Sequence, residues 1–337
     1  MTVMIGVNPH KGSHTAVAVD EAERSLGELR VRSGPSQVDR LVAWAALFPE
    51  RTWAVENATG LGYLLSQQLV AVGERVLDVP PRLAARLRLL ATEAINKNDP
   101  HDARSVAIAA LRSATPKQVR AEDQAAVMKL WAKRQRDLSW AHNKVACRLH
   151  AVLCELIPGG VRGEIYAAQA AKMLEGIEPD GAVAAARHEL ASDLLDDLRR
   201  VDAQLRDSKK RLTAVVAASK TTTTEVFGVG PVVAATVVGI TGDVTRFASR
   251  DRFAAFNGAA TIEVSSGNRG VYRLSRRGNR QLNHAIHMAA VTQIRHRHSE
   301  GRVFYGRKID AEILASAACS AELAELTPAP RHRPAEN

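Results

Sequence analysis

The chain has 337 residues, of which 46% are hydrophobic, enough to bury a sizeable core in each of two domains. Lysine and arginine number 46 against 36 acidic residues, and this net charge of +10 favours a polyanionic partner. Three cysteines without a Cys-x-x-Cys pair, and the lack of any long unbroken apolar run, exclude a disulfide-rich scaffold and a membrane-spanning protein. We expect a soluble, unexported protein of the cytoplasm.

The first eighty residues alternate short β-branched runs with amphipathic segments. Three strands that can pair antiparallel come first, at residues 3–7, 15–19 and 26–32. Helices and strands then alternate, at residues 37–47, 52–55, 62–72 and 75–79. This order predicts an α/β fold in which helices pack on a mixed sheet.

Two aspartates stand three residues apart where a loop is expected to become a helix. Pro100 suits the first position of a helix, which would make Asp99 the N-cap and Asp102 the third helical residue. The pair then either caps the helix and offsets its dipole, or offers two carboxylates to a metal ion. The stretch alone leaves both interpretations open.

Two more oxygen-bearing side chains stand where predicted strands end. Asn8 follows the first strand, and Glu56 ends the strand at 52–55. The carboxyl ends of strands are where open α/β sheets place their ligands. Together with Asp99 and Asp102, they could form a set of hard oxygen ligands for Mg²⁺ or Mn²⁺. Two such ions could clamp a phosphodiester for in-line attack.

The middle of the chain changes to long helices with a seven-residue repeat. A helix is predicted at 122–156, with apolar residues at heptad positions, and Pro158-Gly159-Gly160 breaks it. A second heptad run extends over 194–215 and is interrupted at Ser208. The two helices could pair with each other or with a second copy of the chain, and the sequence does not decide between these.

Beyond residue 220, Gly228 and Gly230 precede a proline and an apolar helix, a pattern typical of a helix-hairpin-helix. Such glycines let backbone amides approach a phosphate at the positive N-terminus of a helix. A packed turn between two helices is the alternative. Further segments are expected as helices at 249–256 and 277–298 and as an extended, glycine-rich stretch at 259–273.

The positive charge is concentrated near the C-terminus. Residues 266–308 contain ten lysines and arginines and a single acidic residue, Glu300. Charge of that density favours phosphate contact over a solvated surface, so nucleic acid is the expected partner. The stretch from Ile309 loses this basic character, and we expect its end to be disordered.

Three ordered segments resemble the DEDD transposases of the insertion-sequence 110 family, namely Ile5–Lys11, Val55–Gly60 and Lys97–Arg104. The resemblance extends over residues 3–308. It implies an α/β RNase-H-like (RuvC-like) DEDD domain at 1–115 and a coiled-coil helical insertion at 116–220. A mostly α-helical transposase domain with a helix-hairpin-helix and a catalytic serine would occupy 221–308, followed by an atypical, partly disordered tail at 309–337.

The resemblance, carried over residue by residue, places the family's catalytic and metal-binding tetrad on Asn8, Glu56, Asp99 and Asp102. The family has aspartate at the first of these positions. Asparagine still offers a carbonyl oxygen, but it removes one negative charge from a site expected to hold divalent cations. Weaker metal binding should follow.

A second block of the resemblance lies at Phe253–Gly258, Ser265-Ser266-Gly267 and Arg273–Arg280. It implies that Ser266 is the nucleophile. A glycine-flanked extended segment lets DNA approach closely, although a Ser-Ser-Gly sequence taken alone is also a common turn. Arg269 and Arg273 could offset the charge of the transition state. The residues expected to contact nucleic acid are Arg269, Arg273, Arg276, Arg277, Arg280, Gly228 and Gly230.

The resemblance implies a DNA transposase that cuts and rejoins strands, guided by an RNA that its element encodes. It would act as a homo-oligomer, a dimer or a tetramer. The alternative is a nucleic-acid-binding remnant whose catalysis is impaired by Asn8 and the altered C-terminus. A sugar-kinase- or actin-like phosphotransferase would need a further glycine-rich phosphate loop before the helical region, and we find none.

Overall fold

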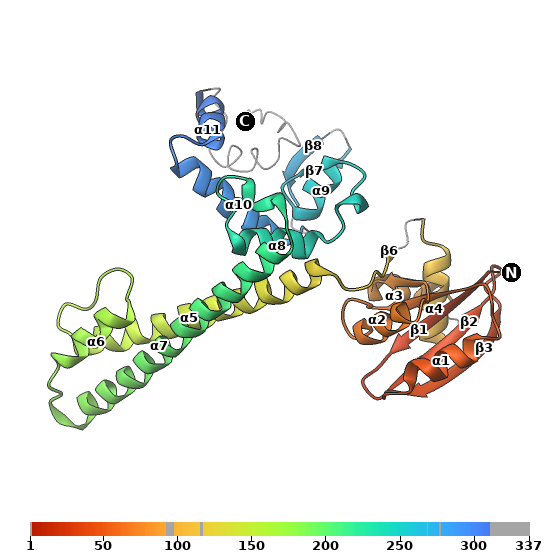
Figure 1. Cartoon of the computed structure of the whole chain (residues 1–337), viewed down its shortest axis with the longest axis horizontal. Helices are drawn as coiled ribbons and strands as arrows, with labels where there is room; N and C mark the ends of the chain where they lie inside the picture. The colour runs from red at the N-terminus through yellow and green to blue at the C-terminus, as the bar shows by residue number, and fades with distance from the viewer. Residues whose placement is uncertain (1, 92–97, 115–116, 268, 276–277, 311–337) are drawn as a thin grey trace. The chain divides into compact units, whose positions relative to one another are not determined.

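Figure 1 shows a computed structural model of the chain, which describes residues 2–91, 98–114, 117–267, 269–275 and 278–310. The predicted tail therefore lies outside the described residues from position 311 onward. By its internal packing the chain divides into two units, Met1–Glu122 and the remainder from Asp123, and each is described by itself. In the described part of the chain, no helix combines the length and apolar character needed to cross a bilayer.

The first unit is built on a mixed sheet of six strands in the order β3-β2-β1-β4-β5-β6. The strands are β1 (Val3–Pro9), β2 (Ser13–Val19), β3 (Ser25–Arg32), β4 (Arg51–Glu56), β5 (Val76–Val79) and β6 (Lys117–Gln118). Neighbours β1, β4 and β5 run parallel, whereas β2, β3 and β6 pair antiparallel. The predicted α/β class with a mixed sheet is confirmed.

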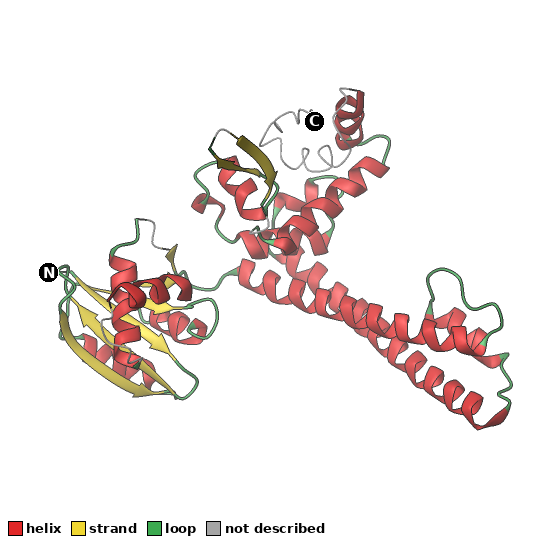
Figure 2. Ribbon diagram, turned by 180° about the vertical axis from the view of Figure 1, so that it is seen from behind, coloured by secondary structure: helices red, strands yellow, loops and turns green. Residues whose placement is uncertain are grey.

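Helices cover both faces of this sheet (Figure 2). They are α1 (Gln37–Ala45) and α2 (Tyr63–Ala71) on one face, and α3 (Pro81–Ala91) and α4 (Asp99–Leu111) on the other. Side chains alternate along a strand, so β1 sends Ile5 and Val7 to the first core and Met4 to the second. Burial of these apolar side chains from both faces holds the sheet between two helical layers.

The contact that fixes α4 on the sheet is made at Gly6 of β1. A Cβ atom at this position would lie 2.0 Å from the carbonyl oxygen of Ala103 and 2.5 Å from the amide nitrogen of Ala107. Glycine alone permits this approach, because helix backbone cannot yield as the end of a flexible side chain can. The first turns of α4 are thereby held directly on β1.

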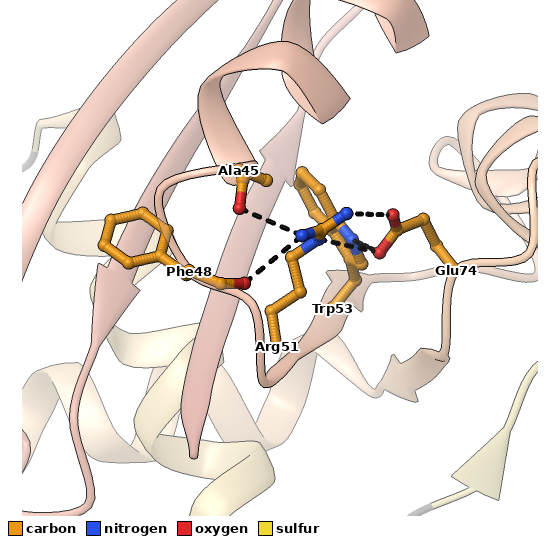
Figure 3. Close-up of polar contacts among 5 residues, drawn as sticks. All are labelled: Ala45, Phe48, Arg51, Trp53 and Glu74. Atoms are coloured by element: carbon orange, nitrogen blue, oxygen red, sulfur yellow. Dashed lines mark hydrogen bonds and ion pairs between the residues drawn. The ribbon is translucent and has the colours of Figure 1, made fainter. Parts of the chain in front are cut away.

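A mostly buried ion pair stabilises the amino end of β4 (Figure 3). Arg51 Nε and Trp53 Nε1 donate to Glu74 Oε2 at 3.0 and 2.7 Å, and Arg51 Nη1 donates to the carbonyl oxygens of Ala45 and Phe48. Burial opposes the ionisation of Glu74, but these hydrogen bonds and the charge of Arg51 outweigh it, so the pKa of Glu74 is held below its usual range. The network ties the end of α1 to β4 and to the turn before β5.

The second unit is mainly helical. Its long helices are α5 (Gln124–Leu156) and α7 (Gly181–Ala218), with α6 (Ala167–Glu175) between them in sequence. The later elements are η1 (Thr222–Glu225), α8 (Pro231–Thr241), η2 (Val244–Arg246), α9 (Arg250–Asn257), β7 (Thr261–Ser266), β8 (Arg269–Leu274), α10 (Arg280–Arg295) and α11 (Glu300–Asp310). The helices predicted at 122–156, 194–215 and 249–256 and the extended stretch at 259–273 appear here, and the helix predicted at 277–298 is shorter than expected, at Arg280–Arg295.

Helices α5 and α7 lie side by side along much of their length (Figures 1 and 2). Leu149, Leu153 and Leu198 are fully buried in the shared core, which α6 also joins. The pairing left open by the sequence is therefore made within one chain. Ser208, which interrupts the heptad pattern, is buried, and its hydroxyl has no hydrogen-bond partner among the described residues.

Helix α8 packs between the amino end of α5, the end of α7 and α10. Two glycines allow close backbone contacts in this region. A Cβ at Gly239 of α8 would lie 2.6 Å from the amide nitrogen of Lys129 on α5, and a Cβ at Gly228 would lie 2.9 Å from the carbonyl oxygen of Ala289 on α10. Because both obstacles are backbone atoms, neither position tolerates a side chain. The elements after α7 are thus built onto the base of the long helix pair.

We predict that Gly6→Ala lowers the free energy of unfolding of the full-length protein by about 3 kcal/mol or more, since even one methyl group would collide with α4 backbone. Gly12→Ala is the matched control, because no described atom lies within 4 Å of a methyl group placed at that position and its backbone is not left-handed. Urea unfolding followed by circular dichroism measures both. Equal stabilities of the two variants would contradict the contact.

We predict that Glu74→Gln lowers the free energy of unfolding at pH 7 by about 2 kcal/mol, between the values for buried and surface ion pairs. The pKa of Glu74 is lower in the folded state, so its stabilisation is present above the unfolded pKa and is lost as the pH falls through the folded pKa. The difference between wild type and variant should therefore shrink below about pH 4. Glu28→Gln, at an exposed site, should change little at either pH.

Candidate active site

Asn8 and Glu56 lie next to each other at the carboxyl ends of two parallel strands. β1 and β4 pair in register at Val7 and Val55, so the following residue of each strand stands side by side at the sheet edge. Because Val7 and Val55 face the α1–α2 core, the alternation of side chains turns Asn8 and Glu56 toward the α4 face. The predicted meeting of these two residues is thus a consequence of strand register.

The start of α4 differs from the sequence prediction in one respect. The N-cap is Asn98, whose side-chain oxygen accepts a hydrogen bond from the amide of His101 at 2.9 Å, and the helix begins at Asp99. The prediction of Asp99 as N-cap is therefore wrong: Asn caps as well as Asp, and Pro100 fits the second helical position as readily as the first. Asp102 becomes the fourth helical residue, and the cap leaves the carboxylate of Asp99 to other partners.

Asp99 lies close to an imidazole and a guanidinium side chain. Its Oδ1 lies 3.4 Å from His10 Nε2, just beyond β1, and its Oδ2 lies 3.7 Å from Arg30 Nη2 on β3. Both ion pairs are partly exposed, so each contributes little stability. They nevertheless place the first carboxylate of α4 at the same end of β1 as Asn8. Sequence reasoning missed both partners, because His10 lies three residues after the end of the first predicted strand and Arg30 lies in the third.

Asp102 is 6% exposed and lies one residue before Ala103, whose carbonyl oxygen touches Gly6. The close approach at Gly6 therefore brings this carboxylate over β1. Asp102 and Glu56 both have polar or charged interactions of their own in the structure. Asn8 and Glu56 are thus strand neighbours, Asp99 lies beside His10 just beyond β1, and Asp102 stands on α4 next to its contact with β1.

A fifth oxygen, which sequence reasoning missed, belongs to Thr15. Thr15 pairs with Asn8 across the β1–β2 ladder and so faces the same side of the sheet. It is 2% exposed, and its hydroxyl has no hydrogen-bond partner among the described residues. A buried hydroxyl without a partner costs about 1–3 kcal/mol, so a ligand that bound it would recover that energy. The strand register was the signal that could have identified it.

The chemistry of these donors fits a hard divalent cation. Carboxylate, amide and hydroxyl oxygens are the ligands that Mg²⁺ and Mn²⁺ prefer. Among the described residues, however, no three His, Cys, Asp or Glu side chains are gathered tightly enough to hold a metal ion. A cation at this edge would have to draw Asp99 away from His10 and Arg30.

The predicted nucleophile belongs to the second unit. Ser266 is the last residue of β7 and pairs with Arg269, the first residue of β8, across a tight turn in which Gly267 has φ +60°. The side chains of Ser266 and Arg269 lie outside the described residues, as do Arg276 and Arg277 altogether. Arg273 on β8 and Arg280 at the start of α10 are exposed, so both remain accessible to a ligand.

Gly228 and Gly230, both predicted to approach a phosphate, have different surroundings. Gly228 adopts φ +80° and packs on α10, where Gln293 Nε2 also donates to the carbonyl oxygen of Phe227 at 2.8 Å. Packing alone therefore accounts for this glycine. Gly230 is the N-cap of α8, and no described atom lies within 4 Å of a Cβ built there. The amino end of α8 is left open at Gly230.

Comparison with known proteins gives two family matches. A model described as "Transposase IS116/IS110/IS902 family" matches residues 221–306, and a transposase model for the DEDD transposases of IS110 matches residues 5–158. The "Insertion element IS116 uncharacterized 44.8 kDa protein" of Streptomyces clavuligerus is 26% identical over 354 aligned positions, which cover 91% of this chain and 88% of the relative.

Two solved structures of Thermus thermophilus RuvC also match. One, described as RuvC in complex with a Holliday junction substrate, is 21% identical with a TM-score of 0.29 and covers 35% of this chain and 100% of that chain. The other, described as a RuvC structure, is 20% identical with a TM-score of 0.28 and the same coverage.

We predict that Asn8→Asp tightens the binding of Mn²⁺ to the full-length protein by about tenfold, or about 1.4 kcal/mol, because it adds a carboxylate beside Glu56. Isothermal titration calorimetry measures the dissociation constant. Asn143→Asp, which adds the same charge at an exposed position of α5, is the control and should leave the affinity unchanged. Equal affinities for the two variants would remove the sheet edge as the metal site.

Proposed function

Since this chain belongs to the IS116/IS110/IS902 family of transposases, we propose that it cuts and rejoins DNA with its acidic sheet edge and the serine of its β7–β8 hairpin. What supports the proposal is that Asn8 and Glu56 end neighbouring strands, that Asp99 lies 3.4 Å from His10 just beyond β1, and that Asp102 precedes the contact of α4 with Gly6. Both matched regions contribute, because the acidic residues lie within 5–158 and the serine within 221–306.

These four residues, here called the acidic edge, would position a phosphodiester. Bound by Asn8, Glu56, Asp99 and Asp102, a divalent cation would supply Lewis-acid charge to the phosphate. The unpartnered hydroxyl of Thr15 would add a hydrogen bond or an oxygen ligand beside Asn8. Arg30, released from Asp99, would remain at the rim as a positive charge for the DNA backbone.

The serine would make the cut reversible. Its oxygen forms a bond to phosphorus as the bond to the sugar oxygen breaks, the serine gives up its proton, and the leaving hydroxyl gains one. Attack by the hydroxyl of another strand reverses these changes and rejoins the DNA without an external energy source. Arg273 on β8 would offset the negative charge that develops on the phosphate.

The proposed partners follow from charge and from the division of the site. Residues 266–308, with ten basic residues and one acidic residue, favour DNA, and the open amino end of α8 at Gly230 offers amides to its backbone. Guidance by an element-encoded RNA and assembly into a dimer or tetramer extend the proposal. In such an assembly the acidic edge and the serine of one centre could come from different subunits.

A second candidate is a DNA-binding remnant with impaired catalysis. Asn8 in place of aspartate supports it, as does the engagement of Asp99 by His10 and Arg30. Such a protein would bind the element ends but would form no covalent product at any Mg²⁺ concentration. The trapping experiment below separates the two candidates.

We predict that the protein, incubated with its element ends, cognate RNA and Mg²⁺, forms a covalent DNA adduct that resists denaturation. Ser266→Ala should abolish it, because no other group would supply the attacking oxygen. The matched control is Ser265→Ala at the neighbouring strand position, which should retain most of the adduct. Denaturing gels and mass spectrometry of the attached peptide measure the product.

Other outcomes of this experiment are equally definite. An adduct that survives Ser266→Ala and disappears with Ser265→Ala would move the nucleophile by one residue. The absence of any adduct in wild type, together with its appearance in Asn8→Asp, would favour the impaired remnant. No adduct in either protein would contradict the serine mechanism.

A further inference from the structure

The two long helices of the second unit share one core but carry very different charges. α5 has six basic residues, Lys129, Lys133, Arg134, Arg136, Lys144 and Arg148, against Asp137 and Glu155. α7 has seven basic residues, Arg187, Arg199, Arg200, Arg206, Lys209, Lys210 and Arg211, against six acidic ones, Glu189, Asp193, Asp196, Asp197, Asp202 and Asp207. The solubility of a helix pair requires polar outer faces, but it does not require a single sign of charge.

The basic residues of α5 gather on one side of the helix. Lys133, Arg136, Trp140, Lys144 and Arg148 follow one another at intervals of three or four residues, so they form a continuous stripe, here called the α5 basic face. All but the partly buried Arg136 are exposed. At about 1.5 Å per residue the stripe extends over roughly 20 Å. Leu149 of the α5–α7 core and the buried Leu138 fall on the other side.

An exposed tryptophan lies at the centre of this stripe. Trp140 is 64% exposed, and the guanidinium of Arg136 lies 5.5 Å from its ring centroid. A ligand that covered this large apolar ring would recover the free energy of its burial. The arginine covers one face of the indole and fixes its orientation. The ring is therefore presented among mostly basic side chains instead of being packed into the core, and the one carboxylate on the same face, Asp137, lies 3.9 Å from Arg136.

An aromatic ring set in a row of cations is the arrangement by which proteins bind single-stranded nucleic acid: bases stack on the ring and phosphates contact the lysines and arginines. A double helix would satisfy the charges but not the ring, because its bases are already stacked on each other. A second copy of α5 would bring positive charge against positive charge. The combination of charge and ring thus favours an unpaired strand.

We propose that the α5 basic face binds an unpaired stretch of nucleic acid, with a base stacked on Trp140 and phosphates on Lys133, Lys144 and Arg148. This inference rests on the proposed function only in taking nucleic acid as the partner. It adds a binding surface apart from the acidic edge, the β7–β8 hairpin and the basic segment 266–308. The strand could be RNA or DNA, since both present the same base faces and phosphates.

Full-length protein in EDTA, which prevents metal-dependent cutting, is titrated with fluorescein-labelled 15-nucleotide oligo(dT), oligo(U) and a mixed-sequence duplex of equal length. Trp140→Ala should weaken binding of at least one single strand by about 5- to 100-fold, the range for loss of one stacked base, and Trp140→Phe should restore most of it. The duplex should respond to Trp140→Ala by less than twofold. The arm that responds identifies the strand as RNA or DNA.

The charge of the face is tested by a matched pair of double variants. Lys133→Gln/Lys144→Gln should weaken single-strand binding by about tenfold and reduce the slope of log K against log salt by about 1.4, since two phosphate contacts are lost. Lys209→Gln/Lys210→Gln removes the same charge from exposed positions of α7 and should change the affinity by less than twofold. Circular dichroism confirms that all variants retain the helical fold.

Photo-cross-linking locates the strand independently of affinity. Oligonucleotides that carry 5-iodouracil should cross-link to Trp140, as identified by mass spectrometry of the α5 peptide. Unchanged affinity in every α5 variant together with no cross-link in α5 would overturn the inference. So would concentration-dependent self-association that is lost in Trp140→Ala, because the face would then bind a second copy. Neither result depends on the covalent adduct at Ser266, so the two proposals fail separately.

Discussion

The architecture of the first unit depends on one backbone contact, between Gly6 of β1 and the Ala103–Ala107 turn of α4. Because no side chain separates helix from strand there, α4 lies against the sheet in a single position. That position sets Asp102 over β1 and brings Asp99 to His10 beyond the strand end. A glycine with no chemistry of its own therefore decides where the carboxylates of a distant helix lie.

At the acidic edge, different side chains cap the helix and contact the carboxylates. Asn98 caps α4, so Asp99 is not needed for that task, and Asp99 is met instead by His10 and Arg30. The guanidinium of Arg30 offsets part of the negative charge of Asp99. Asparagine at position 8 acts in the same direction, because this buried side chain carries no charge. In the proposed metal site, both features would lower the affinity for a divalent cation.

Much of this arrangement could be predicted from sequence, for identifiable reasons. The β-branched runs of β1 and β4 predict strands that carry Asn8 and Glu56 at their ends, and register then makes those residues neighbours. The heptad pattern located α5 and α7 but could not decide whether they pair within one chain, because a seam of the same residues serves either case. The N-cap was misplaced by one residue, since Asn98 and Asp99 cap equally well. Thr15 was missed because its significance depends on a strand partner.

The pairing of α5 with α7 also bears on how this protein can change in length. The two helices join a core around Leu149 and Leu198 at one end to a core around Met128 and Leu212 at the other. One residue inserted into a single helix would rotate the apolar face of that helix by about 100° beyond the insertion, so its apolar residues would no longer meet those of the partner helix. Insertions or deletions between these two cores are therefore tolerated only when α5 and α7 change together, by about seven residues each. Relatives of different size should therefore differ in this region by whole heptads that are inserted or deleted in both helices together.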